Sequence, residues 1–182
     1  AHVSATPSTM LALGTRMPAF RLPDANGAIV SSDACAGRPV LVAFICRHCP
    51  FVRHIRREFA RFTSEFLARG LPTIAINSND VEAFPEDGPE GMKQEAGEAG
   101  YTFPYLYDET QEVAKVFKAA CTPDLFLFDA SGSLVYRGQF DSSRPRSDAP
   151  VTGADIRAAA SALLETRPIP LDQRPSVGCN IK

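Results

Sequence analysis

The sequence lacks a long apolar run and an excess of positive charge. Its longest apolar runs, 40–46 and 125–128, have the length of a strand and are far shorter than the roughly 20 residues that span a membrane. The 19 Lys and Arg stand against 21 Asp and Glu, for a formal net charge of −2, so no broad basic face is available for phosphates. We therefore expect a soluble protein that binds neither nucleic acid nor membranes.

The sequence also lacks a secretory signal and a dense set of cysteines. Residues 1–14 have no charged start followed by a sustained apolar core, although a signal already removed would leave no trace. Five cysteines are an odd number and too sparse for a disulfide-stapled secreted domain. We predict a cytoplasmic protein, with the periplasm as the alternative if a signal was removed.

The patterns that are present predict one α/β domain. Its 182 residues, 45% hydrophobic, suffice for a single core. Turn residues and hydrophobic periodicity predict a sheet that begins parallel and closes antiparallel. The expected elements are a β-hairpin in 13–32, a buried strand at 40–45, a helix to Gly70, a strand at 71–77, a helix to Gly100, a strand at 103–107, a helix at 110–120, a hairpin of 125–129 and 134–139, and a helix to 166. In the helix at 110–120, Val113, Val116 and Phe117 are expected to face the core. The last helix is expected to have Thr152 as N-cap and Asp155 as its capping-box partner.

The C-terminal segment differs in composition from the rest. Residues 167–182 contain three prolines, so we expect them to run extended over the surface, beyond a core of about 13–166. Chain 1–182 is therefore predicted to be one domain with an extended tail.

The segment FICRHCPFVRHI (44–55) carries the chemistry. It places Cys46 and Cys49 where the buried strand meets the following helix. Free N–H groups at a helix start stabilise a thiolate, so we expect Cys46 to attack and Cys49, one turn deeper, to resolve the mixed disulfide. Arg47 and His48 would favour the thiolate further. Half a zinc site is the alternative, but no second CxxC or HxxxH is present, so no metal site is predicted.

Together these features resemble the thioredoxin superfamily. The hairpin, the strand ending in Cys46-Arg-His-Cys49-Pro50, the helix after it, and Thr122-Pro123 before a strand hairpin carry the resemblance. The opening GTRMPAFRLPDANG is similar to the AhpC/TSA–redoxin branch, which includes peroxiredoxins and thiol–disulfide oxidoreductases. The resemblance implies a thioredoxin-like α/β fold, with a central mixed sheet flanked by helices and an N-terminal β-hairpin.

The resemblance also implies how the site works. Pro123 matches the superfamily's cis-proline, whose backbone would pair with a substrate strand beside Cys46. A thiol–disulfide oxidoreductase of this kind needs no cofactor besides its Cys46–Cys49 disulfide. Its partners would be protein or small-molecule disulfides and thiols, with thioredoxin or glutathione as electron donor, and no particular oligomeric state is predicted.

A peroxiredoxin-like peroxidase with antioxidant activity is the first alternative. Cys49-Pro50 matches the peroxidatic Cys-Pro, with Cys46 in place of the activating threonine. Against it, Pro123 stands where the peroxiredoxin arginine would fall, which leaves Arg53 or Arg137 to replace it.

Thioredoxins differ from this chain in two further respects. The chain has no tryptophan, so the aromatic residue before the first cysteine is missing. Ala43 stands where thioredoxins bury a proton-accepting aspartate, which leaves water, His48 or an unidentified residue for that role.

Three more cysteines and one non-enzymatic function stay open. Cys121 lies near the motif by the family geometry, and Cys179 resembles a C-terminal resolving cysteine; each is a candidate redox cysteine or an incidental thiol. Cys35 is expected to be incidental. A copper chaperone that uses Cys46, Cys49 and a histidine is the second alternative.

Overall fold

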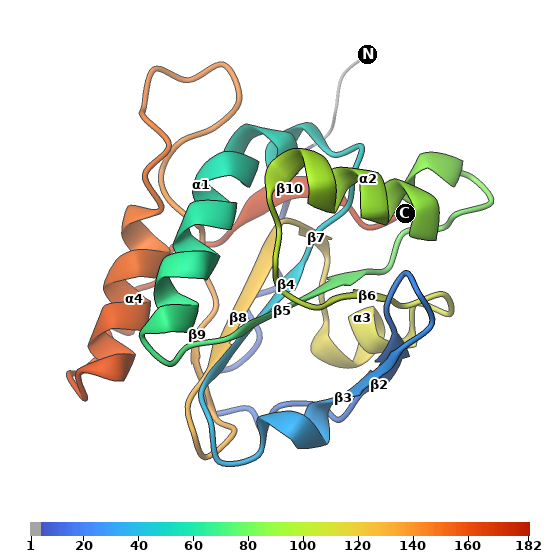
Figure 1. Cartoon of the computed structure of the whole chain (residues 1–182). Coiled ribbons are helices and arrows are strands. Elements are labelled where there is room, and N and C mark those ends of the chain that lie inside the picture. The colour runs from blue at the N-terminus through green and yellow to red at the C-terminus, as the bar shows by residue number, and fades with distance from the viewer. Residues whose placement is uncertain (1–4) are drawn as a thin grey trace.

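The computed structural model describes residues 5–182 (Figure 1). Its centre is a five-stranded mixed sheet with strand order β6-β5-β4-β8-β9. β4, β5 and β6 are parallel, whereas β8 is antiparallel to β4 and β9 to β8. The strands are β4 (Val40–Phe44), β5 (Thr73–Asn77), β6 (Tyr105–Tyr107), β8 (Asp124–Phe128) and β9 (Leu134–Tyr136). The predicted parallel crossover with an antiparallel closure is confirmed.

Helices and a hairpin cover the two faces of this sheet (Figure 1). β4 shows why, because its side chains alternate between two apolar clusters: Leu41 and Ala43 face one, and Val42 and Phe44 the other. The first cluster includes residues of α1 (Pro50–Ala68), α2 (Pro89–Ala99) and α4 (Ala154–Leu164). The second includes residues of α3 (Glu112–Phe117) and of the hairpin β2 (Arg21–Pro23) and β3 (Ile29–Ser31).

The prediction for the C-terminal segment is wrong. Instead of running extended over the surface, residues 167–182 contain β10 (Val177–Asn180), the middle strand of a small sheet of order β1-β10-β7. β1 (Ala5–Pro7) and β7 (Cys121–Thr122) pair with it antiparallel. Both partners lie far from β10 in the sequence, so local composition did not reveal the pairing.

The predicted N-cap of the last helix is also wrong. α4 begins after Gly153, which has a φ of 69°, and Thr152 lies outside the helix. The backbone N–H groups of Thr152 and Gly153 both donate to Oδ2 of Asp141, each at 2.8 Å, and the Thr152 hydroxyl accepts the N–H of Ala154 at 3.2 Å from outside the helix. Asp155 instead accepts a hydrogen bond from Gln139 at 2.7 Å.

The inward-facing residues of α3 are partly different from those expected. Val113 and Phe117 are buried as predicted, but Val116 is 54% exposed and Ala114 is buried in its place. The helix spans only Glu112–Phe117, and positions 113, 114 and 117 form its apolar stripe.

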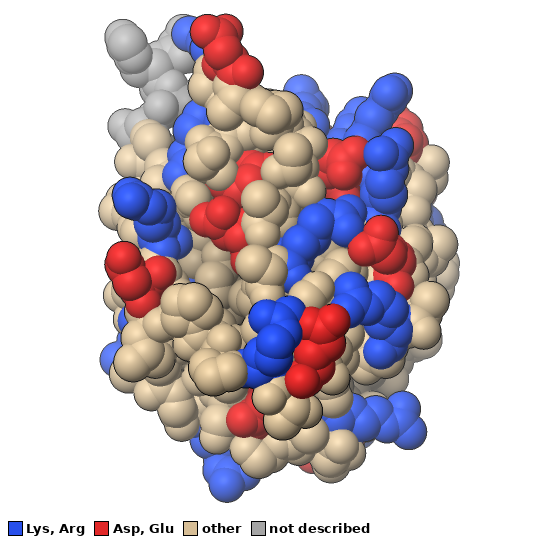
Figure 2. All heavy atoms as spheres, turned by 90° about the vertical axis from the view of Figure 1, so that its left-hand side faces the viewer, with Lys and Arg blue, Asp and Glu red and all other residues tan. Residues whose placement is uncertain are grey.

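Charges of both signs are interspersed over the face that carries α1 and α4 (Figure 2). Arg157 of α4, for example, pairs with Glu65 of α1 at 2.7 Å.

No helix within residues 5–182 is long and apolar enough to cross a membrane. The remaining elements are two short 3₁₀ helices, η1 (Ser32–Cys35) and η2 (Pro85–Asp87). Residues 1–4, the first part of the predicted domain, lie outside the described residues.

Candidate active site

The two cysteines of the motif occupy different positions relative to α1. The helix begins at Pro50, and Cys49 is its N-cap with extended backbone angles. Proline is favoured at the first helical position and disfavours helical angles in the residue before it, which explains this start. Cys46 lies three residues before the cap. The prediction that both cysteines lie at the strand-to-helix junction agrees with this start, but Cys49 does not lie one turn deeper in the helix than Cys46, as was expected.

The hydrogen bonds around the two thiols favour charge on Cys49. Bonds with the thiols of Cys179 and Cys46 lower the pKa of Cys49, more than burial raises it, and the Val52 N–H in the first turn of α1 adds to the effect. For Cys46, the bond with Cys49, burial and the charge of Asp87 all raise the pKa. Both side chains are fully buried, with 0% exposure.

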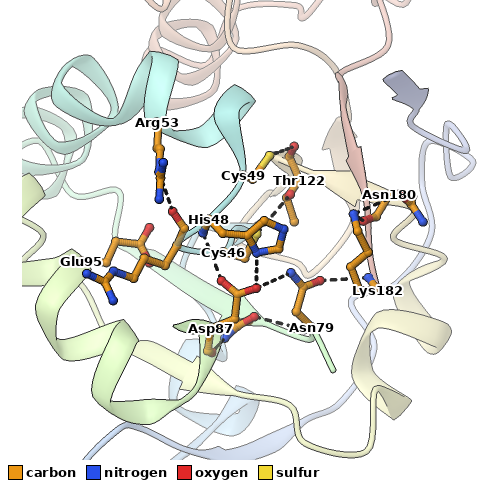
Figure 3. Close-up of polar contacts among 12 residues, drawn as sticks. Cys46, His48, Cys49, Arg53, Asn79, Asp87, Glu95, Thr122, Asn180 and Lys182 are labelled. Carbon is orange, nitrogen blue, oxygen red and sulfur yellow. Dashed lines mark hydrogen bonds and ion pairs between the residues drawn. The ribbon is translucent and has the colours of Figure 1, made fainter. Parts of the chain in front are cut away.

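Thr122 and Pro123 lie against the cysteine pair. The Thr122-Pro123 peptide bond is cis, as predicted. The Thr122 hydroxyl is 3.6 Å from the Cys46 sulfur, and the Thr122 carbonyl oxygen accepts a bond from the Cys49 thiol at 3.3 Å (Figure 3). The backbone edge expected to receive a substrate strand is already paired with β10, because Thr122 faces Cys179 in the register.

Of the other cysteines, Cys179 joins the pair directly. It is 3% exposed, packs in the same apolar cluster as Cys46 and Cys49, and shares a thiol hydrogen bond with Cys49. The thiol of Cys121 instead donates toward the carbonyl oxygens of Pro123 and Ser176, at 3.6 and 3.9 Å. Burial and Asp124 raise the pKa of Cys121. Cys35 lies in η1, away from the cluster.

A buried carboxylate that the sequence did not single out holds His48. Asp87 is 0% exposed and accepts hydrogen bonds from the His48 backbone N–H at 3.1 Å and from Asn79 Nδ2 at 3.0 Å (Figure 3). His48 Nδ1 bonds to the same carboxylate, and its ring stacks on Phe84 with centroids 4.9 Å apart. Arg47 lies 3.8 Å from Glu98. The residues between the cysteines thus face carboxylates, which offset the positive charge expected to favour the thiolate.

Two asparagines, at the end of β5 and just after it, complete the support of Asp87. Asn77 Nδ2 donates to the Asp87 main-chain oxygen. Asn79 Oδ1 accepts the backbone N–H of Lys182 at 3.0 Å, so one amide bridges the carboxylate and the C-terminal segment (Figure 3). Polar residues directly after a buried strand were the available signal, since ligand-facing groups gather at the carboxyl ends of parallel strands.

A second buried carboxyl group lies on α2. Glu95 is 1% exposed, and the hydroxyl of Tyr105 donates to it at 2.7 Å. Burial raises its pKa to about 7. The charge of Asp87 also raises this pKa, whereas Tyr105, Arg56 and Arg47 lower it.

Three side chains offer possible metal ligands. One ligand atom each of Cys46, His48 and Asp87 lies within 4.8 Å of the other two. The Asp87 carboxylate, however, is already bonded to His48 and Asn79, so a metal ion would have to break these bonds. The donor set is therefore better suited to fixing His48 than to holding an ion.

Comparison with known proteins places this site in a family. Residues 13–137 match the model of the AhpC/TSA family. The chain belongs to the AhpC/TSA family. This finding confirms the resemblance that the hairpin, the cysteine motif and Thr122-Pro123 indicated.

Several relatives of this AhpC/TSA protein are known. A Mycobacterium tuberculosis protein named "Putative peroxiredoxin Rv2521" is 32% identical over 115 residues, which are 63% of this chain and 68% of that protein. The crystal structure of an uncharacterized conserved protein from Geobacillus kaustophilus is 50% identical, with a TM-score of 0.96 over 100% of this chain and 97% of that chain. A thiol:disulfide interchange protein of the thioredoxin family from Chlorobium tepidum TLS is 20% identical, with a TM-score of 0.63 over 84% of this chain and 98% of that chain. The last likeness shows the fold, and the thioredoxin-like mixed sheet flanked by helices is confirmed.

Arg53 and Arg137, the two candidates to replace the peroxiredoxin arginine in this AhpC/TSA protein, bond to other groups than the thiols of the motif. Arg53 is exposed and donates through Nε to the carbonyl oxygen of Arg47 at 3.1 Å. Arg137 donates to the carbonyl oxygen of Leu11 at 2.8 Å and to Gln173. In the described part of the chain, no guanidinium hydrogen-bonds to either thiol of the motif.

Proposed function

We propose that this protein is a thiol–disulfide oxidoreductase in which Cys49 is the attacking thiolate and Cys46 the resolving thiol. The observation that carries the proposal is the position of Cys49 at the N-cap of α1, where thiols and a backbone N–H donate to it. This reverses the order of roles expected from the sequence, which placed Cys49 one turn deeper than Cys46.

The exchange proceeds in two displacements. The Cys49 thiolate attacks one sulfur of a substrate disulfide, forms a mixed disulfide and releases the first substrate thiolate. Cys46 then loses its proton and attacks the Cys49 sulfur, which releases the second thiolate and leaves a Cys46–Cys49 disulfide. A ring nitrogen of His48 and a carboxylate oxygen of Asp87, each within 4.8 Å of the Cys46 sulfur, are the groups proposed to take that proton. A dithiol, or two molecules of glutathione, returns two electrons to restore the pair and leaves as a disulfide.

A peroxidase is the second candidate, because family membership and the relative named as a peroxiredoxin favour it. In that reaction, the Cys49 thiolate would attack a peroxide oxygen and become a sulfenic acid, which Cys46 would condense to the same disulfide. The positions of Arg53 and Arg137 argue against it, because neither guanidinium is placed to polarise a peroxide.

Parallel assays of insulin disulfide reduction and hydrogen peroxide consumption test the proposal. We expect the wild type to reduce insulin, Cys49→Ser to lose this activity by about 100-fold or more, and the control Cys35→Ser to retain it. Peroxide consumption in the absence of insulin reduction would identify the peroxidase instead.

The order of roles has its own test. With Cys49→Ser, the wild-type nucleophile is absent, so no mixed disulfide with the substrate should accumulate on Cys46. A stable mixed disulfide on Cys46 in this variant, detected by mass spectrometry, would restore the order that the sequence suggested.

A further inference from the structure

β10 lies where an extended substrate would be expected to bind. It pairs antiparallel with β7, with Cys179 opposite Thr122 and Asn180 opposite Cys121. Just before the strand, the Ser176 hydroxyl donates to the Pro123 carbonyl oxygen at 2.6 Å. The backbone next to cis-Pro123 is thus satisfied by the protein's own chain.

The docking of β10 is close. A Cβ atom added at Gly178 would lie 1.8 Å from the Thr122 carbonyl oxygen, which no side chain permits. The strand therefore approaches β7 with backbone against backbone, and it carries Cys179 as the next residue. This places the Cys179 side chain at a fixed depth beside the cysteine motif.

Cys179 lies against the same residues as the cysteine motif. Its partner in the register, Thr122, accepts a hydrogen bond from the Cys49 thiol through the carbonyl oxygen at 3.3 Å, and the Thr122 hydroxyl is 3.6 Å from the Cys46 sulfur. Cys46, Cys49 and Cys179 pack in one buried apolar cluster, and β10 contacts α1, the helix that Cys49 caps. Hydrogen bonding between the two thiols lowers the pKa of Cys49 and raises the pKa of Cys179. Three buried thiols therefore meet beside Thr122, and Cys179 is the one carried by the strand that occupies the substrate edge.

We propose that Cys179 is a third redox-active thiol, which forms a disulfide with Cys49 in exchange with Cys46. The inference rests on the proposed function, since it assigns a second resolving partner to the Cys49 mixed disulfide. Cys179 attacks the Cys49 sulfur, the substrate thiolate leaves with the Cys179 proton, and a Cys49–Cys179 disulfide forms. Attack by Cys46 on that disulfide gives Cys46–Cys49 and returns Cys179 to the thiol, with no net gain or loss of electrons.

The test uses glutathione disulfide and variants without Cys46. After Cys46→Ser is treated with glutathione disulfide and its free thiols are alkylated, peptide mapping should find Cys49 linked to Cys179. The double variant Cys46→Ser/Cys179→Ser should instead keep glutathione on Cys49. The matched control Cys46→Ser/Cys121→Ser removes the other buried cysteine of this sheet and should still form the Cys49–Cys179 link.

Glutathione retained on Cys49 in Cys46→Ser, with Cys179 alkylated, would overturn the inference. If Cys46→Ser does not fold, Cys46→Ala under the same treatment gives the same readout, and in the wild type a Cys49–Cys179 link should appear transiently before Cys46–Cys49. Insulin reduction by the wild type tests the proposed function separately. A linked Cys49–Cys179 in a protein that cannot reduce insulin would retain this inference and reject that function.

Discussion

Cys46 and Cys49 are chemically identical side chains with two residues between them, and their surroundings make them different. Cys49 precedes a proline that starts α1, so the free N–H groups of the first turn are available to its sulfur. Cys46 lies before the cap and near the charge of Asp87, which raises its pKa. The Cys49-Pro50 dipeptide already contained this information, because a proline at the first helical position implies that the preceding residue is the cap.

The Asp87 carboxylate alone accepts several hydrogen bonds of the site, so we expect Asp87→Asn to destabilise the fold. The asparagine cannot accept all the hydrogen bonds that the His48 and Asn79 donors make to the carboxylate. A buried donor left without a partner costs about 1–3 kcal/mol, so the free energy of unfolding should fall by that amount. Urea denaturation measures it, with the exposed neighbour change Glu86→Gln as the control. Equal stability of both variants and the wild type would contradict this role of Asp87.

At the scale of elements, periodicity predicted most of the sheet and its helices. The continuous apolar run of β4 and the apolar stripe of α1 are local signals, and both elements formed as expected. β10 gave no such signal, because its four residues, Val177–Asn180, follow three prolines and are stabilised by strands more than 50 positions away. The partnership of His48 with Asp87 spans 39 positions and depends on the same kind of long-range packing.

The docking of β10 can be tested with two glycine substitutions. Gly178→Ala should displace the strand, because the new Cβ would meet the Thr122 carbonyl oxygen, and iodoacetamide should then modify Cys49 faster than in the wild type. Gly97→Ala on α2 is the control, since no atom lies within 4 Å of its added Cβ. It should leave the alkylation rate unchanged and stabilise the protein by up to about 1 kcal/mol. Equal alkylation rates in both variants would show that β10 does not cover Cys49.

Val116 and Phe117 are neighbours on α3, and substitutions at these two positions test which face of this helix is buried. Phe117 is 0% exposed and packs edge-on against Phe44, Phe126 and Phe128. We expect Phe117→Ala to lower the free energy of unfolding by about 3–5 kcal/mol. Val116 is 54% exposed, so Val116→Ala should change it by about 0.5 kcal/mol or less. Similar losses for both variants in chemical denaturation would contradict this orientation.

For the whole molecule, Glu95 makes stability depend on pH. Burial raises its pKa from 4.5 to about 7, so the folded protein holds this proton at pH values where the unfolded chain has lost it. The contribution of Glu95 to stability is therefore complete below about pH 4.5 and is lost as the pH rises toward 7.

Glu95→Gln should remove this dependence while keeping an acceptor for the Tyr105 hydroxyl. The stability of the variant relative to the wild type should increase by up to about 3 kcal/mol between about pH 5 and about pH 8. Urea denaturation across this range measures the difference, and the exposed change Glu82→Gln provides the control. A constant difference between Glu95→Gln and the wild type would contradict the raised pKa.

Asn79 joins two parts of the molecule that the sequence separates widely. Its amide accepts from the Lys182 backbone with one end and donates to the Asp87 carboxylate with the other. Binding equilibria that share one group are coupled reciprocally. Release of Lys182 from Asn79 therefore weakens the hold on Asp87, and loss of the negative charge on Asp87 loosens the hold on Lys182 by the same free energy. The strand that covers the thiols and the carboxylate that orients His48 thus form one thermodynamic unit.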